Sequence, residues 1–266
     1  MPRRLRVSTG GFAYHVLNRA VGRGLLFEDD ADYLAMQRVI ERTHKRLPIR
    51  IVSYCLMPNH WHLVLWPEKN GDLSEFMRLL TVTHTQRWHA HHHSAGTGPL
   101  YQGRFKSFPI QQDEHFLTVC RYVERNAVRA NLVRSARRWP WSSPAQRAAK
   151  APPTWLLPTR QWPVPPPKDW TAWVNRAQTL AELKAVRQCV TRGRPYGDDQ
   201  WEQRTAELLG LESTQRPRGR PRVRPIKDSR PLIPSPTLSM MLRSGPPGNA
   251  SAAALWITRR REKSRM

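Results

Sequence analysis

The chain has 266 residues, with 44 lysines and arginines against 20 aspartates and glutamates, a formal net charge of +24 at pH 7. Such an excess of positive charge repels itself in a compact state and predicts a polyanionic partner. The 24 prolines and a hydrophobic content of 39% predict that only part of the chain folds around a core. Three scattered cysteines, Cys55, Cys120 and Cys189, exclude a disulfide scaffold and a zinc ribbon and fit a reduced compartment.

Membrane insertion and secretion are both disfavoured. No apolar run approaches the roughly 20 residues that a bilayer-spanning helix needs. The arginines near the N-terminus are not followed by the apolar stretch of a secretory signal. We therefore expect a cytoplasmic protein that has no membrane partner and binds nucleic acid.

The first predicted elements are a strand, a helix and a β-hairpin. Phe12–Ala20 alternates its side chains in the two-residue period of a strand. Apolar residues at helical intervals predict a helix over Asp32–Leu47, which Pro48 ends. The apolar runs Ile49–Leu56 and Trp61–Trp66 flank a turn-forming dipeptide, which is typical of a hairpin.

Two helices and a strand follow the hairpin. The 3.6-residue period predicts a helix from Asp72 to about His89 and a second helix over Asp113–Val133. The segment between these two helices, Tyr101–Gln111, is predicted to form a strand. This order of elements predicts an α+β fold with an antiparallel, ferredoxin-like sheet.

The hairpin carries two histidines that face the same way. His60 and His62 project from one face of their strand, whereas Trp61 and Leu63 point into an apolar layer on the other face. Two imidazoles on a rigid strand can bind one divalent ion if a third ligand comes from elsewhere. The alternative is a pair of half-buried strand histidines. We interpret His15, in the first strand, as an ordinary residue of a sheet face.

A second group of histidines competes as a metal site. Adjacent residues of a helix do not face one ion, so we interpret this group as a solvated, weakly basic helix end. Its members are His89, His91, His92 and His93.

The last predicted helix supplies a tyrosine and an amide. Asn126 follows Tyr122 by four residues, so both side chains project from one edge of the helix. This edge can lie over the strand that carries His60 and His62. The alternative for Tyr122 is an aromatic residue that flanks the core and directs its hydroxyl to solvent.

Three motifs stand out in the order of the chain. They are Met57-Pro58-Asn59-His60-Trp61-His62, Tyr101-Gln102-Gly103-Arg104-Phe105-Lys106-Ser107 and Tyr122-x-x-x-Asn126-x-Val128-Arg129-Ala130. Together they resemble the REP-associated tyrosine transposases, IS200-like members of the single-tyrosine HUH (His-hydrophobic-His) endonucleases. The similarity covers about residues 11–143. The family commonly has Pro where Ala127 stands and Gly where Asn131 stands, and we expect both replacements to be compatible with a helix.

The resemblance implies an enzyme that cleaves and rejoins single-stranded DNA through a covalent 5′-phosphotyrosine. Tyr122 would be the nucleophile, and His60, His62 and Asn126 would bind Mg²⁺ or Mn²⁺. Two neutral imidazoles and an amide leave the charge of the ion uncompensated, so that it can polarise a phosphate. Zinc ranks second, because zinc sites usually add thiolate or carboxylate ligands. A free tyrosine has a pKa of about 10, and nearby positive charge would favour its phenolate.

The resemblance also implies the target, which would be hairpins of repetitive extragenic palindromes in a bacterial chromosome. The protein would then be associated with the nucleoid, as a monomer or a homodimer. The basic residues predicted to bind the nucleic acid are Arg104, Lys106, Arg121, Arg125, Arg129, Arg216, Arg218, Arg220 and Arg222.

We predict four segments: a catalytic domain (1–145), a Pro/Trp-rich linker (146–170), a small, basic, helical DNA-binding extension (171–225) and a disordered tail (226–266). The tryptophans of the linker either pack it onto the catalytic domain or stack on bases. Residues 216–222 resemble an AT-hook, whose arginines enter a narrow minor groove. An unspecific basic tail is the alternative.

Three other functions remain open at this point. The chain can be a non-cleaving regulatory protein that binds DNA hairpins and derives from a transposase. It can be a metal-dependent nuclease that uses water, with Tyr122 only structural, or an RNA-binding module. The presence of all four residues His60, His62, Tyr122 and Asn126 favours the strand-transferring enzyme.

Overall fold

A four-stranded antiparallel sheet forms the centre of the structure, with strand order β2-β3-β1-β4. The structure, a computed structural model, describes residues 7–216. The α+β fold with an antiparallel sheet is confirmed. The strands are β1 (Ala13–Arg19), β2 (Arg50–Met57), β3 (His60–Trp66) and β4 (Lys106–Ile110).

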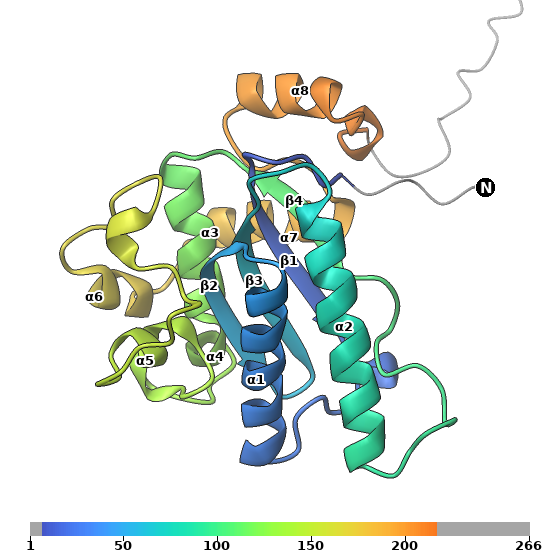
Figure 1. The fold of residues 1–266 in the computed structure, drawn as a ribbon. Helices are drawn as coiled ribbons and strands as arrows, with labels where there is room; N and C mark the ends of the chain where they lie inside the picture. The colour runs from blue at the N-terminus through green and yellow to red at the C-terminus, as the bar shows by residue number, and fades with distance from the viewer. Residues whose placement is uncertain (1–6, 217–266) are drawn as a thin grey trace, which may run out of the picture. The chain divides into compact units, whose positions relative to one another are not determined.

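Helices cover both faces of the sheet (Figure 1). The helices α1 (Asp30–Arg46) and α2 (Asp72–His91) lie on one face, and α3 (Glu114–Glu124) and α7 (Leu180–Arg192) lie on the other. None of the helices in residues 7–216 is long and apolar enough to cross a membrane. The shorter elements are η1 (Val21–Arg23), α4 (Asn126–Arg129), η2 (Ala136–Arg138), α5 (Ser143–Arg147), η3 (Thr159–Gln161), α6 (Trp170–Asn175), α8 (Asp199–Leu208) and η4 (Glu212–Thr214).

The alternation of side chains along β3 divides the core into two layers. Trp61 and Leu63 are fully buried in the layer with α1 and α2, as predicted. Val64 points the other way and packs in the layer with α3 and α7. Because successive strand residues face opposite sides, His60 and His62 belong to the α3 side.

The region predicted as one helix over 113–133 is divided and ends earlier. The helix α3 ends at Glu124, α4 follows from Asn126, and Asn131 has a φ of 57°. The amide of Leu132 donates to the Ala127 carbonyl, which closes the helix in a Schellman arrangement. The prediction that position 131 is helical is therefore wrong. The backbone there is left-handed, which favours glycine and which asparagine tolerates better than most residues.

The predicted strand 101–111 is also shorter in the structure. Tyr101 forms only an isolated bridge with Ala20, and continuous pairing with β1 begins at Lys106. Gly103, between them, interrupts the pattern of side chains on the strand.

The proline-rich segment after residue 145 packs against the sheet domain. Trp155 is buried in the α1/α2 layer, and Trp162 is buried on the other side, 5.6 Å from Phe116 between ring centroids. The Leu157 amide donates at 2.8 Å to the carbonyl of Ile51, a residue of the outer strand β2. These two tryptophans thus serve packing. The boundaries at 145, 170 and 225 stay predictions, and 226–266 lies outside the described residues.

One buried carboxylate connects the end of α3 to the segments that follow it. Glu124 is fully buried, and its Oε1 lies 2.6 Å from Nη1 of Arg147. The same oxygen accepts hydrogen bonds from Ser53 and Ser143. Its Oε2 accepts from the indole of Trp170 at 2.7 Å. Both oxygens of this buried charge therefore accept from donors, as buried charges require.

Acidification should destabilise the protein through His84. This α2 histidine is buried, with Nδ1 2.6 Å from the Tyr101 hydroxyl, and burial lowers its pKa to about 4. The unfolded chain binds a proton at about pH 6.5, so this contribution to stability is complete above that pH and lost as pH falls towards 4. We expect a loss of about 3 kcal/mol. Urea denaturation of the wild type and His84→Phe between pH 7 and pH 4 would measure it, and equal pH slopes would contradict it.

Candidate metal and nucleophile site

The two predicted metal-binding histidines lie next to each other at the start of β3. His60 pairs with Arg19 on one side and with Met57 on the other, and His62 pairs with Leu17. The rings of His60 and His62 have centroids 5.0 Å apart and are nearly perpendicular. His62 is buried, whereas His60 is half-buried. The strand therefore presents one partly exposed imidazole, His60, and one buried imidazole, His62.

Both rings are oriented by a contact at Nδ1. Nδ1 of His60 lies 2.6 Å from Oδ1 of Asn59, and Nδ1 of His62 lies 2.9 Å from Nε2 of His15. Nε2 is thus the nitrogen that each ring can offer to an ion. Burial lowers the pKa of His60 to about 4 and the pKa of His62 well below its usual value, with the Arg129 charge contributing in both cases. Both imidazoles are neutral at pH 7, as metal ligands must be.

The structure brings Tyr122 next to these histidines. Its ring centroid lies 5.8 Å from that of His62 and 6.1 Å from that of His15, edge-on in both cases. Val119 and Val123 of α3 are buried in the core below the helix, which fixes its rotation. The predicted nucleophile and one predicted ligand thus meet, although 60 residues separate them in the chain.

Arg129 joins Tyr122 to Asn126. Its guanidinium carbon lies 4.2 Å from the centroid of the Tyr122 ring, and Nη2 donates to Oδ1 of Asn126 at 3.0 Å. Nδ2 of Asn126 is buried and has no hydrogen-bond partner within residues 7–216. An amide oxygen has two lone pairs, so Oδ1 can accept from Arg129 and also bind an ion. By their chemistry, two neutral imidazoles and an amide oxygen suit a divalent cation.

Arg121 and Arg125, two predicted DNA contacts, bind the protein itself. Arg121 donates to the carbonyls of Arg176 and Ala177 at 2.9 and 3.0 Å and is only 5% exposed. Arg125 donates to the carbonyl of Asn175 at 2.8 Å. Both guanidinium groups hold the connection between α6 and α7 against α3.

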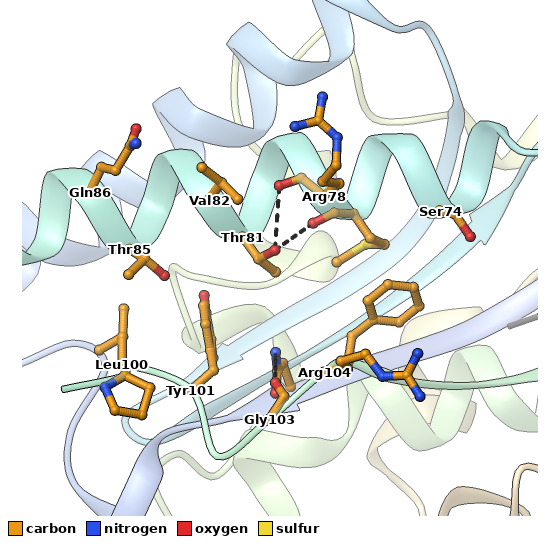
Figure 2. A pocket seen from close by; sticks show the side chains of 14 residues that line it. Ser74, Arg78, Thr81, Val82, Thr85, Gln86, Leu100, Tyr101, Gly103 and Arg104 are labelled. Atoms are coloured by element: carbon orange, nitrogen blue, oxygen red, sulfur yellow. Dashed lines mark hydrogen bonds between the residues drawn. The ribbon is translucent and has the colours of Figure 1, made fainter. Parts of the chain in front are cut away.

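Arg104 and Lys106 are exposed at the β4 edge of the sheet. Arg104 lines a cavity of about 820 Å³ between α2 and the segment 99–105. Figure 2 shows Thr85, Gln86 and Val82 of α2 on one side of this cavity, opposite the segment that carries Arg104. Arg216 is also exposed, whereas Arg218, Arg220 and Arg222 lie outside the described residues.

His15 is the site residue that sequence reasoning missed. It is fully buried, and its Nδ1 has no hydrogen-bond partner in the described part of the chain. The register pairs Leu17 with His62, so these two side chains lie on the same face of the sheet. His15 is two residues before Leu17 on β1 and therefore lies on this face too. The only signal in the sequence was the two-residue spacing along the strand, which does not show that His15 faces His62 until the strand register is known.

The histidines at the end of α2, predicted to be solvated, differ in exposure: His91 and His93 are exposed, whereas His92 is half-buried. His91, His92 and Asp32 offer ligand atoms that all lie within 4.8 Å of one another. Adjacent residues converge here because α2 ends at His91, and His92 is the C-cap residue with φ −89° and ψ 10°.

Part of the chain is similar to a family of transposases, which are DNA-processing proteins. Residues 8–126 match the profile of the family described as "Transposase IS200 like". The predicted resemblance to this family is confirmed over these residues. The family is one of DNA-cleaving enzymes of the HUH type.

Two solved structures are similar to the chain. The first is "Structure of the REP associates tyrosine transposase bound to a REP hairpin", with 20% identity, 59% of this chain and 92% of that chain covered, and a TM-score of 0.47. The second is a putative transposase from Deinococcus radiodurans R1, with 16% identity, 49% and 95% covered, and a TM-score of 0.32. A search of curated proteins found no match.

Proposed function

We propose that this protein is a metal-dependent single-strand DNA endonuclease and strand transferase that acts on REP-type hairpin DNA. The observation that carries this proposal is the contact of Tyr122 with His62, one of two neutral imidazoles on the same strand face. A water-using nuclease needs no tyrosine at that position. The enzyme would act on chromosomal DNA in the bacterial cytoplasm, and its state as monomer or homodimer stays a prediction.

The proposed reaction exchanges one phosphodiester bond for another. The Tyr122 oxygen bonds to the scissile phosphorus, and the bond from phosphorus to the 3′ oxygen breaks. The leaving 3′ oxygen of the upstream strand takes up a proton, which balances the proton that the Tyr122 phenol gives up, and becomes a 3′ hydroxyl. The downstream strand stays attached as a 5′-phosphotyrosine until a 3′ hydroxyl reverses the reaction. Bond energy is conserved in the tyrosine link, so joining needs no ATP.

The protein's own groups prepare this step. His60, His62 and Asn126 would hold Mg²⁺ or Mn²⁺ through Nε2, Nε2 and Oδ1, with zinc as the second choice. When bound, the ion supplies positive charge that polarises the scissile phosphate. Arg129 places a second positive charge over the face of the Tyr122 ring, next to the proposed position of the phosphate.

Exposed basic residues suit the phosphates of the hairpin. We assign Arg104, Lys106 and Arg216 to these contacts, and the unpaired strand beside the stem to the cavity that Arg104 lines. In this proposal Arg121 and Arg125 act indirectly, because they hold the α6–α7 connection. Arg218, Arg220 and Arg222 keep the predicted role of an AT-hook-like segment. Phosphate contacts of this kind weaken steeply with added salt.

A labelled hairpin oligonucleotide with single-stranded flanks tests the proposal. With Mn²⁺, we expect the 3′-labelled strand to migrate with the protein on a denaturing gel and the 5′-labelled fragment to be released free. Chelation should abolish both products. Cleavage without an adduct would overturn the proposal in favour of the water-using nuclease. Tight binding without cleavage, on any hairpin tested, would favour the non-cleaving regulatory protein.

His15→Phe should lower Mn²⁺ affinity at the catalytic site by about tenfold or more, as loss of a residue behind a metal ligand typically does. When Nδ1–H of His62 donates to Nε2 of His15, the Nε2 lone pair of His62 is free for the ion. Phenylalanine fills the same space but cannot accept this hydrogen bond, so the tautomer and the ring orientation are no longer fixed.

Titration calorimetry or Mn²⁺ electron paramagnetic resonance would measure the affinity. His84→Phe is the matched control, because His84 is an equally buried histidine on the other face of the sheet. Equal affinities in His15→Phe and His84→Phe would show that His15 has no positioning role.

A further inference from the structure

We propose that Asp32, His91 and His92 form a second metal site, distinct from the catalytic one, that takes Zn²⁺. The three side chains offer one carboxylate oxygen and two imidazole nitrogens, all within 4.8 Å of one another. The first turn of α1 and the last turn of α2 lie side by side at this point (Figure 1). His60 and His62 belong to the opposite face of the sheet.

Two of the three ligands are already held in place. Asp32 is 5% exposed, and its Oδ2 accepts a hydrogen bond from the Glu28 amide at 2.9 Å. Its Oδ1, the proposed ligand atom, lies 3.0 Å from Nε2 of His92. The His92 ring stacks on Trp88 with centroids 4.3 Å apart and an interplanar angle of 25°. Ligands fixed by their own partners bind a metal with less loss of freedom.

The distance between Asp32 and His92 also suits an ion between them. Zinc binds imidazole nitrogen at about 2.0–2.1 Å and carboxylate oxygen at about 2.0–2.2 Å. In a tetrahedral site, neighbouring ligand atoms are then slightly more than 3 Å apart. An ion therefore needs only a small opening of the present contact, with His91 closing in from the exposed side.

The donor set favours zinc over Mg²⁺ and Ca²⁺. Imidazole suits Zn²⁺, whereas Mg²⁺ and Ca²⁺ prefer sites made of oxygen. A cavity of about 200 Å³ borders the cluster and is lined by Asp32, His91 and Trp88, which leaves room for a water molecule as fourth ligand. Arg38 and Arg87 line the same cavity, and their charges oppose the cation. The Asp32 carboxylate offsets part of this repulsion.

An ion at this site would connect the start of α1 to the end of α2. Its ligands come from two segments 60 residues apart, so the unfolded chain cannot present the same site. A ligand that binds only the folded state raises the melting temperature with its concentration. The site would therefore stabilise the layer of α1 and α2, independently of any reaction at Tyr122.

The test is the zinc stoichiometry and Tm of the full-length protein after removal of metal, measured by competition with a chromophoric chelator and by calorimetry. His91→Ala is the decisive variant, because His91 is exposed and its loss leaves no cavity. His93→Ala is the matched control, an exposed histidine two residues away and outside the cluster.

We expect the wild type and His93→Ala to bind one more zinc ion than His91→Ala. Zinc at about a hundredfold excess over Kd should raise their Tm by on the order of 5 °C more than that of His91→Ala. His62→Ala separates this site from the catalytic one, since it should lose only the catalytic ion and keep the shift. Equal stoichiometry and equal Tm shifts in the wild type and His91→Ala would overturn the proposal.

Discussion

Tyr122→Phe should abolish the covalent protein–DNA adduct and lower hairpin cleavage by about 10⁴-fold or more, the usual effect of removing a nucleophile. Phenylalanine keeps the ring against His62 and under the Arg129 guanidinium, so the packing of α3 stays intact. Only the attacking oxygen is lost. Hairpin binding should therefore remain near the wild-type level in a gel-shift assay, while denaturing gels show no adduct.

Tyr196→Phe is the control for this variant. Tyr196 is also a buried tyrosine on the α3 side of the sheet, with its ring 6.4 Å from Phe108 between centroids. The Tyr196→Phe variant should cleave the hairpin and form the adduct like the wild type. Wild-type cleavage by Tyr122→Phe would show that water is the nucleophile and that Tyr122 only packs against the histidines.

Glu124→Gln should destabilise the protein by about 3 kcal/mol, because breaking a buried ion pair leaves an uncompensated charge. Arg147 would lose its partner at 2.6 Å while its side chain stays 17% exposed. Glutamine also replaces one acceptor oxygen with an NH₂ group, which cannot accept from Ser53, Ser143 or Trp170. Urea denaturation at pH 7 would measure the change.

Two further variants identify the cause of this effect. Glu75→Gln also breaks a 2.6 Å ion pair, with Arg78, but that pair is exposed, and we expect no measurable change. Glu124→Gln combined with Arg147→Met should recover part of the loss, because the unpaired charge is removed too. If the double variant loses as much free energy of unfolding as the two single variants together, the unpaired charge of Arg147 is not the cause.

The sequence by itself determined the local structure of this protein. The two-residue period of its strands placed His60 and His62 on one face and Trp61 on the other, and the 3.6-residue period identified the helices on both sides of the sheet. Three short motifs were enough to identify the family. Such properties depend on neighbours a few residues apart, which the sequence lists directly.

Only the tertiary structure decided which faces meet. Strand register placed His15 behind His62, and helix packing placed Tyr122 beside them. Packing of the C-terminal segment engaged Arg121 in contacts within the protein. The pairing of α1 with α2 brought Asp32 to His92, although each looks like an ordinary residue of a helix end. Contacts between residues tens of positions apart depend on the summed burial and hydrogen bonding of whole elements, and no local pattern contains that sum.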